Sequence, residues 1–303
     1  MSARRQSDRH GAIRLVLSSA LLVATLAACA GLERVSRTHS SEQTSSPVIR
    51  ESDGSYDYIE MYRLYNMAEA AWDGEESFRD TDWKLEFFEH KETLTRGVAI
   101  ESDDILYISF RATSAEIGKA DRIYNLRIHR RPPAWIDGPS PVQVHRGFMS
   151  RYEAVRDDVL NRILASDAHE IVFTGASAGG ALSLLAFMDA LVLLDDAKPL
   201  HHVSFGMPRI FDAGGARWMR TMVEDRSAPT SIVRIVNGND PIPALPPPLF
   251  GYRHVTPAHH IGPPARWYLV SGADHHPGYR NTLRRLADIS GAAIEELPYS
   301  RGP

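Results

Sequence analysis

The stretch from Glu170 to Phe187 restricts the fold of this chain more than any other. A short β-branched run, Ile171 to Thr174, predicts a buried strand. An almost wholly apolar segment, Ala181 to Leu194, predicts a buried helix. Between them lies Gly175-Ala-Ser-Ala-Gly179, a G-x-S-x-G pattern. A strand, a sharp turn and a helix in this order are the context that a nucleophile elbow needs.

Ser177 stands at the centre of this turn and is the predicted nucleophile. Gly175 and Gly179 allow the strand and the helix to approach closely, and the two alanines between them add little bulk. The serine hydroxyl would then stand at the helix N-terminus, where partial positive charge favours a developing oxyanion. The alternative is a chance match to a short pattern. The strand before the turn and the helix after it argue against that alternative.

Composition fits a single globular domain. The chain has 303 residues, of which 43% are hydrophobic, with a formal net charge of -4 and a pI near 6.4. This balance excludes the nucleic-acid binders that depend on a strongly basic surface. Cys29 is the only cysteine, so neither an internal disulfide nor a thiolate metal cluster is available.

The N-terminus has the features of a signal peptide over residues 1–28. Arginines lead into an apolar run that is too short to span a bilayer comfortably. The run ends Leu26-Ala-Ala-Cys29, which resembles a bacterial lipoprotein lipobox. That resemblance implies that Cys29 is lipidated and anchors the protein in the cell envelope, and Ala30 would favour the outer membrane. An ordinary signal peptide is the alternative. Residues 29–56 are polar and Ser-rich and predict a flexible tether.

Residues 57–303 alternate between strand and helix patterns without an internal repeat. They predict an α/β fold with a central, mostly parallel sheet flanked by helices. The expected helices are 58–72, 150–164, 181–194 and 279–289, and the expected strands are 83–89, 95–100, 104–110, 171–174, 201–209, 231–237 and 266–270.

Short motifs along most of residues 58–286 resemble the class 3 lipases, the fungal triacylglycerol-lipase type of α/β-hydrolase. Ala112 and Ala176 depart from the family pattern, which usually has Gly and an aromatic residue or His there. The matching motifs are Phe110-Arg-Ala-Thr113, Asp121 with Asn125-Leu126, Val144-His-Arg-Gly-Phe148 with Tyr152, the elbow, Phe205-Gly-Met-Pro-Arg209, Asn237 with Asp240-Pro241, Pro246-Pro247 and Gly251-Tyr-Arg-His254.

The order Ser177, Asp240, then a histidine is the order of an α/β-hydrolase triad. A serine hydroxyl needs a base to remove its proton, and that base needs an orienting carboxylate. Asp240 follows a predicted strand and precedes a proline, a rigid place for a carboxylate. A turn-forming Asp-Pro is the alternative interpretation. The resemblance implies that Thr113 and the backbone N–H of Ala178 form the oxyanion hole.

The catalytic histidine has two adjacent candidates, His275 and His276. The fungal members place their histidine three residues before an aromatic residue, which favours His276 with Tyr279. A longer spacing, found in other members, would select His275. Pro277 also biases His276 towards an extended conformation, which would fix its direction. We therefore predict His276.

Six other histidines also need an interpretation. His145 and His254 match positions of the family that are structural, so hydrogen-bonding roles in the core are expected. The remaining four have no carboxylate partners at metal-binding spacing, so no metal site is predicted. These are His201, His202, His259 and His260.

The pattern as a whole predicts a membrane-anchored serine esterase or lipase that needs no cofactor and hydrolyses lipid or other carboxylic esters. The family also includes phospholipases and feruloyl esterases. The segment 114–121, where family lids lie, has little apolar surface and favours shorter or more soluble acyl chains. The competing hypothesis is a non-catalytic envelope lipoprotein that keeps the fold to bind lipid or a partner. A degenerate site would be its signature, yet every triad position is filled.

Overall fold

The computed structural model describes residues 49, 55–73, 83–102, 104–112, 127–136, 141–263 and 271–289. The predicted signal peptide, Cys29 and most of the predicted tether lie outside these ranges, as do Thr113, the predicted lid segment 114–121 and the predicted strand 266–270. In the part that is described, no helix combines the length and the apolar character needed to cross a membrane.

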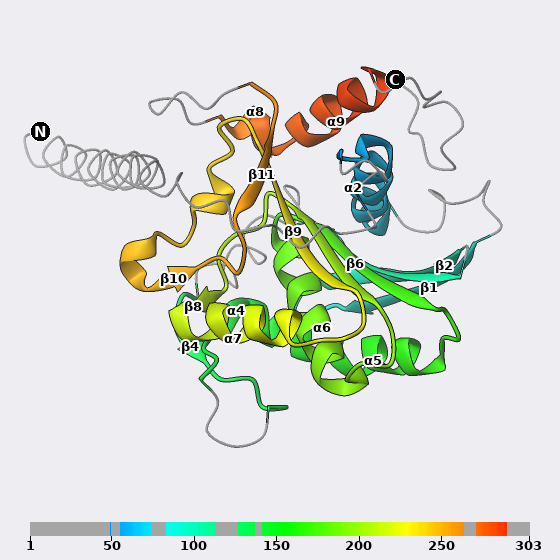
Figure 1. Cartoon of the computed structure of the whole chain (residues 1–303). Coiled ribbons are helices and arrows are strands. Elements are labelled where there is room, and N and C mark those ends of the chain that lie inside the picture. Colours follow the sequence, from blue (N-terminus) through cyan, green and yellow to red (C-terminus); the bar gives the residue numbers. More distant parts are fainter. Residues whose placement is uncertain are drawn as a thin grey trace, which may run out of the picture.

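A twisted sheet of seven strands, in the order β1-β2-β3-β6-β7-β9-β11, forms the centre of the described chain (Figure 1). The strands from β3 to β11 pair in parallel, whereas β1 and β2 form antiparallel hairpins with their neighbours. The predicted α/β fold with a mostly parallel sheet is confirmed. The strands are β1 (Lys84–His90), β2 (Thr95–Ser102), β3 (Ile105–Phe110), β6 (Glu170–Ala176), β7 (Leu200–Phe205), β9 (Thr230–Asn237) and β11 (Ala258–Ile261).

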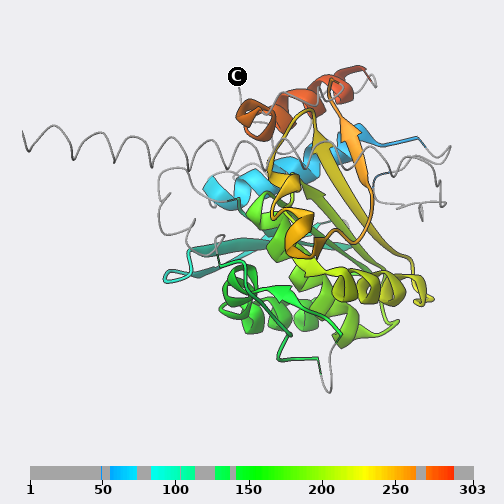
Figure 2. The ribbon, with the colours of Figure 1, turned by 90° about the vertical axis from the view of Figure 1, so that its left-hand side faces the viewer.

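Helices cover both faces of this sheet (Figures 1 and 2). α2 and α9 pack on one face, and α4, α5, α6 and α7 pack on the other. Two single-turn 3-10 helices, η4 and η5, and the short α8 follow the later strands. The helices are α2 (Tyr58–Asp73), α4 (Arg146–Glu153), α5 (Arg156–Ala165), α6 (Ala178–Leu194), α7 (Ala213–Glu224), η4 (Ile242–Ala244), η5 (Pro248–Phe250), α8 (Gly272–His275) and α9 (Gly278–Ile289).

α6 is the central helix of the core. Every residue from Ala178 to Leu191 is buried, as its uniformly apolar sequence predicts. Its one charged residue in this stretch, Asp189, accepts two hydrogen bonds from Arg156 and one from the hydroxyl of Tyr152. This compensation allows a carboxylate to remain inside the core.

A second, small antiparallel sheet lies beside the carboxyl ends of the central strands (Figure 1). Its order is β10-β8-β5-β4, and each strand has two residues. Such short strands have no hydrophobic period, so the sequence offered no signal for them. They are β4 (Arg130–Arg131), β5 (Val144–His145), β8 (Phe211–Asp212) and β10 (Tyr252–Arg253).

Three further features differ from the sequence expectations. The single helix expected over 150–164 is two helices, α4 and α5, separated at Ala154 and Val155. The edge strand β11 was not predicted, because its sequence Ala-His-His-Ile has no strand-like alternation. The loop expected at 272–280 contains the short helix α8, which begins after the capping side chain of Ser271.

Candidate active site

The turn between β6 and α6 is a strained elbow, as its sequence predicts. Ser177 has φ 54° and ψ -124°, a conformation that non-glycine residues rarely adopt. A Cβ added to Gly175 would lie 2.4 Å from the carbonyl carbon of Gly179, and one added to Gly179 would lie 2.2 Å from the carbonyl oxygen of Phe110. Both positions therefore require glycine, and the close packing lifts the serine above the sheet.

A continuous chain of hydrogen bonds connects Ser177 to a buried carboxylate. The Nε2 atom of His275 lies 2.9 Å from Ser177 Oγ, and its Nδ1 atom lies 2.8 Å from Asp240 Oδ2. The His275 side chain is 22% exposed, whereas the Asp240 side chain is fully buried. The imidazole thus lies between the hydroxyl and the carboxylate, in the arrangement that activates a serine nucleophile.

Asp240 is held firmly at the end of β9. Its Oδ1 accepts from the backbone N–H of Ile242 at 2.9 Å, and its Oδ2 accepts from the hydroxyl of Tyr279 at 2.8 Å as well as from His275. These donors compensate for the loss of water around a buried charge. The Asp-Pro turn and the carboxylate's role at the site are therefore compatible, since the turn itself donates one of the hydrogen bonds.

Tyr279 belongs to the site and was not assigned a role from the sequence. Its hydroxyl accepts from the backbone N–H of Asn237 at 3.1 Å while it donates to Asp240. Burial, with a further contribution from the Asp240 carboxylate, raises the pKa of Tyr279 well above its ordinary value. The tyrosine therefore remains a neutral donor. The sequence analysis used Tyr279 only for its distance along the chain from the two candidate histidines. Nothing in the sequence indicates that its hydroxyl contacts Asp240.

The loop that carries His275 is tied to the end of β9 by two bonds. Asn237 Nδ2 donates to the carbonyl oxygen of Asp274 at 2.9 Å, and the backbone N–H of Asn239 donates to Asp274 Oδ2 at 2.8 Å. Because β9 also delivers Asp240, these bonds fix the imidazole relative to its carboxylate. Asp274 is thus a positioning residue that the sequence did not single out.

The structure places His275, and not the predicted His276, between Ser177 and Asp240. α8 ends at His275, and the next residue leaves the helix with φ -149° and ψ 121°. The His276 side chain is 67% exposed, and its Nδ1 lies 3.5 Å from Glu69 Oε1. Adjacent side chains at such a helix end point in different directions, so only His275 faces Ser177.

The predicted oxyanion hole is described only in part. Ala178 is buried at the first position of α6, where a backbone N–H has no partner within the helix. The neighbouring N–H of Ser177 donates to the carbonyl oxygen of Phe205 at 2.8 Å and is therefore occupied. Thr113, the other predicted member, lies outside the described residues.

His145 and His254, which were predicted to be structural, both have hydrogen-bond partners. His145 Nδ1 accepts from the N–H of Gly147 at 3.1 Å, and His254 Nε2 lies 2.8 Å from the carbonyl oxygen of Pro243. Burial lowers the pKa of His254 well below its ordinary value, so it is neutral. Across the described ranges, no group of three or more His, Cys, Asp or Glu side chains is placed to hold a metal ion.

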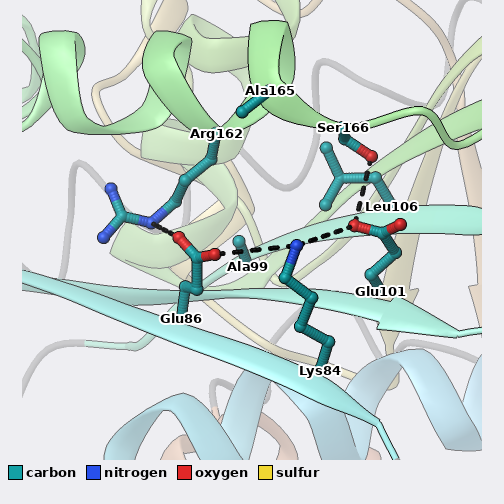
Figure 3. Close-up of a pocket in the computed structure, with 8 residues that line it drawn as sticks. All are labelled: Lys84, Glu86, Ala99, Glu101, Leu106, Arg162, Ala165 and Ser166. Atoms are coloured by element: carbon teal, nitrogen blue, oxygen red, sulfur yellow. Dashed lines mark hydrogen bonds and ion pairs between the residues drawn. The ribbon is translucent and has the colours of Figure 1, made fainter.

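A hollow lies where α5 crosses β1 and β2, and the side chains that line it are not arranged like those around Ser177 (Figure 3). Lys84 lies 3.9 Å from Glu86 and 3.8 Å from Glu101, Arg162 lies 3.5 Å from Glu86, and Ser166 Oγ lies 3.3 Å from Glu101. These groups pair with one another. The hollow also adjoins the start of β3, at the sheet end opposite to the elbow.

Comparison with known proteins shows that this chain is similar to lipases. Residues 107–250 match the family model described as Lipase (class 3). A secreted mono- and diacylglycerol lipase of Fusarium solani is 31% identical over 162 residues, which cover 52% of this chain and 46% of that protein. A lipase of Rhizopus niveus is 30% identical over 172 residues, covering 53% and 40%. The chain spans about half the length of the curated relatives it matches.

Solved structures share the fold. A triacylglycerol lipase from Penicillium expansum has a TM-score of 0.58 at 19% identity, covering 68% of this chain and 80% of that one. Lipase II from Rhizopus niveus has a TM-score of 0.54 at 24% identity, covering 67% and 80%. Both identities are low, so these likenesses establish the α/β-hydrolase fold alone. The matched segment 107–250 and the fungal relatives make this chain similar to the class 3 lipases over about half of its length.

Proposed function

We propose that this protein is a serine hydrolase that cleaves carboxylic esters through an acyl-enzyme, with Ser177, His275 and Asp240 as its triad. The observation that carries the proposal is the unbroken hydrogen-bonded chain from Ser177 Oγ through the imidazole of His275 to Asp240. The lipase relatives support the same reaction class.

The proposed reaction begins when His275 Nε2 takes the proton of Ser177 and Oγ attacks the ester carbonyl carbon. The negative oxygen that forms would accept from the N–H of Ala178 at the positive end of α6, with Thr113 as the predicted second donor. When the C–O bond breaks, His275 returns its proton to the departing alcohol. A water molecule, deprotonated by His275, then attacks the acyl carbon; the bond to Ser177 Oγ breaks, the acid leaves, and His275 returns the proton to Oγ. Asp240 holds the imidazole and stabilises its cation throughout.

Labelling with a fluorophosphonate probe tests the activated serine. The parent protein should label and Ser177→Ala should not. His275→Ala should lose roughly 10³-fold or more in turnover of p-nitrophenyl butyrate, because triad members act as a unit. His276→Ala is the matched control and should retain most of the activity, since its side chain contacts Glu69 and not the triad. The reverse pattern would assign the base to His276.

The proposed substrates are esters of lipids. The Fusarium solani relative is described as acting on mono- and diacylglycerols, and several other relatives carry the same description. The polar composition of 114–121 predicts a preference for shorter acyl chains within this class. A panel of p-nitrophenyl esters from acetate to palmitate measures that preference directly. Highest kcat/KM on palmitate would contradict it.

We also propose that the protein is anchored in a bacterial envelope membrane through lipidated Cys29. The motivation is the Leu26-Ala-Ala-Cys29 sequence at the end of an apolar run. Cys29→Ser should abolish labelling by a palmitate analogue and leave the protein soluble or retained with its signal peptide. Unchanged fractionation together with the absence of labelling in the parent would refute the anchor.

A further inference from the structure

Two large apolar side chains stand in solvent next to each other on η5. Leu249 is 69% exposed and Phe250 is 48% exposed. Isolated exposed apolar residues are ordinary, but adjacent ones at the tip of a turn form a protruding contact. This turn lies on the segment between Asp240 and β10 and is the orange turn to the left of the β10 label in Figure 1. We call Leu249 and Phe250 the apolar tip.

The apolar tip is held in place by arginines from two elements. Arg130 Nη1 donates to the carbonyl oxygen of Phe250 at 3.2 Å, and Arg253 Nη1 donates to that of Pro248 at 2.9 Å. Gly251 closes the turn with φ 81°, which favours glycine. The tip is therefore preorganised with its apolar side chains outward, so its insertion would cost little ordering entropy.

A third exposed apolar residue belongs to the same region. Ile128 is 39% exposed, and its carbonyl oxygen accepts a hydrogen bond from the hydroxyl of Tyr252. The Arg130 guanidinium lies 5.1 Å from the Tyr252 ring. These contacts across the small sheet bring the segment before β4 to the segment around η5.

The two segments that carry the apolar tip and Ile128 have a net positive charge, whereas the whole chain has a net negative one. Residues 127–136 and 241–263 contain no Asp or Glu, although the chain has a formal net charge of -4. They contain four arginines, and one of these, Arg131, pairs with Glu153. Arg130 and Arg253 are exposed beside the apolar tip. Apolar side chains flanked by arginines match a surface with an apolar interior and anionic headgroups.

We propose that the apolar tip and Ile128 dock the protein on the surface of an anionic phospholipid bilayer, with Arg130 and Arg253 at the level of the headgroup phosphates. η5 lies on the segment of the chain that follows Asp240. This inference deepens the proposed function by naming the surface that it works on. Its test is a binding measurement and needs no catalysis.

The experiment measures the binding of the full chain to vesicles of phosphatidylcholine with and without phosphatidylglycerol. All variants carry Cys29→Ser, which removes the proposed anchor, and Ser177→Ala, which prevents hydrolysis. The parent in this background should bind the anionic vesicles more tightly than the neutral ones. Replacing Leu249 and Phe250 by serine should weaken binding at least about tenfold, because two large side chains then lose their apolar burial.

Matched variants distinguish docking through the apolar tip from nonspecific adsorption through any exposed apolar side chain. Leu164→Ser with Leu193→Ser removes two exposed apolar side chains, 62% and 41% exposed, from α5 and α6 and should leave binding unchanged. Arg253→Gln should weaken binding to anionic vesicles about fivefold, whereas Arg253→Lys keeps the charge and should retain most of it. Equal binding by the tip and control variants, or equal affinity for neutral and anionic vesicles, would overturn the proposal.

Discussion

Gly206 offers a test of the site by a single added methyl group. It follows β7 with φ 62°, and its N–H donates to the carbonyl oxygen of Ile235. A Cβ at this position would lie 2.7 Å from Asp240 Oδ2 and 3.1 Å from both Cε1 and Nδ1 of His275. Gly206→Ala therefore pushes directly on the bond between the carboxylate and the imidazole. Unlike substitution of a triad residue, it removes no functional group.

The expected magnitude has two parts. Holding alanine in the left-handed region costs about 1–2 kcal/mol of stability. Relief of the contact with Asp240 must displace the carboxylate or the imidazole by several tenths of an ångström, and a displacement of about 1 Å in a catalytic geometry can cost about 100-fold in rate. We expect kcat for p-nitrophenyl butyrate to fall about 10- to 100-fold. KM should change little, because no contact with the substrate is removed.

Gly251→Ala is the matched control for this substitution. Gly251 also has a positive φ, 81°, and its added Cβ would also lie 2.7 Å from a side-chain atom, Arg130 Nη1. That atom ends an exposed side chain that donates to the carbonyl oxygen of Phe250 and lies over the Tyr252 ring. The control should lose about 1–2 kcal/mol of stability and keep its kcat on the soluble ester. If Gly206→Ala and Gly251→Ala have the same kcat, the argument that Gly206 makes room for the Asp–His pair is wrong.

Three other substitutions test separate parts of the description. Asp240→Asn should lower kcat about 10⁴-fold, since the amide cannot stabilise the imidazolium; near-parental turnover would return Asp240 to a turn-forming role. Tyr279→Phe removes the donor to Asp240 and leaves the Asn237 N–H without its acceptor, so unfolding by urea should show a loss of about 1–3 kcal/mol. Burial raises the pKa of Glu60 to about 7 from an ordinary 4.5, against the lowering effect of Arg63. Between these pH values the unfolded chain releases this proton and the folded chain keeps it, so stability should fall as pH rises. We expect the fall in unfolding free energy to be about 1–2 kcal/mol, because the Glu60 side chain is 17% exposed and solvent screens part of the effect. Glu60→Gln should abolish this fall. An unchanged pH profile of stability would contradict the assignment to Glu60.

The parts of the fold that could be predicted are those with a strong local pattern. The apolar run after Ser177 predicts a buried helix at any position in a protein, and α6 is buried along most of its length. The strands around it have clear β-branched runs and were placed within a few residues. The two-residue strands of the small sheet have no such pattern. They form because the central sheet brings distant segments together, which no local window records.

The triad shows the same division between local and distant information. Ser177 is specified by its neighbours in the turn, and Asp240 by the end of a strand, so both could be identified from the sequence. The supporting contacts of Asp240 come from Tyr279 and from the N–H of Ile242, and only the second is local. The role of Tyr279 depends on α9 packing against the sheet beside α2.

The choice between the two histidines depends on carboxylates from opposite ends of the chain. Asp240, which follows β9, accepts a hydrogen bond from His275. Glu69, on α2, lies beside His276 and also pairs with Arg280. Glu69 further accepts a hydrogen bond from Tyr65. With the two imidazoles directed to different carboxylates, a rotation of the loop that exchanged them would break both sets of contacts. The spacing to an aromatic residue contains none of this information, since it counts residues along one loop. The position of α2 against α9 therefore contributes to which histidine faces Ser177, although α2 itself supplies no group to the triad.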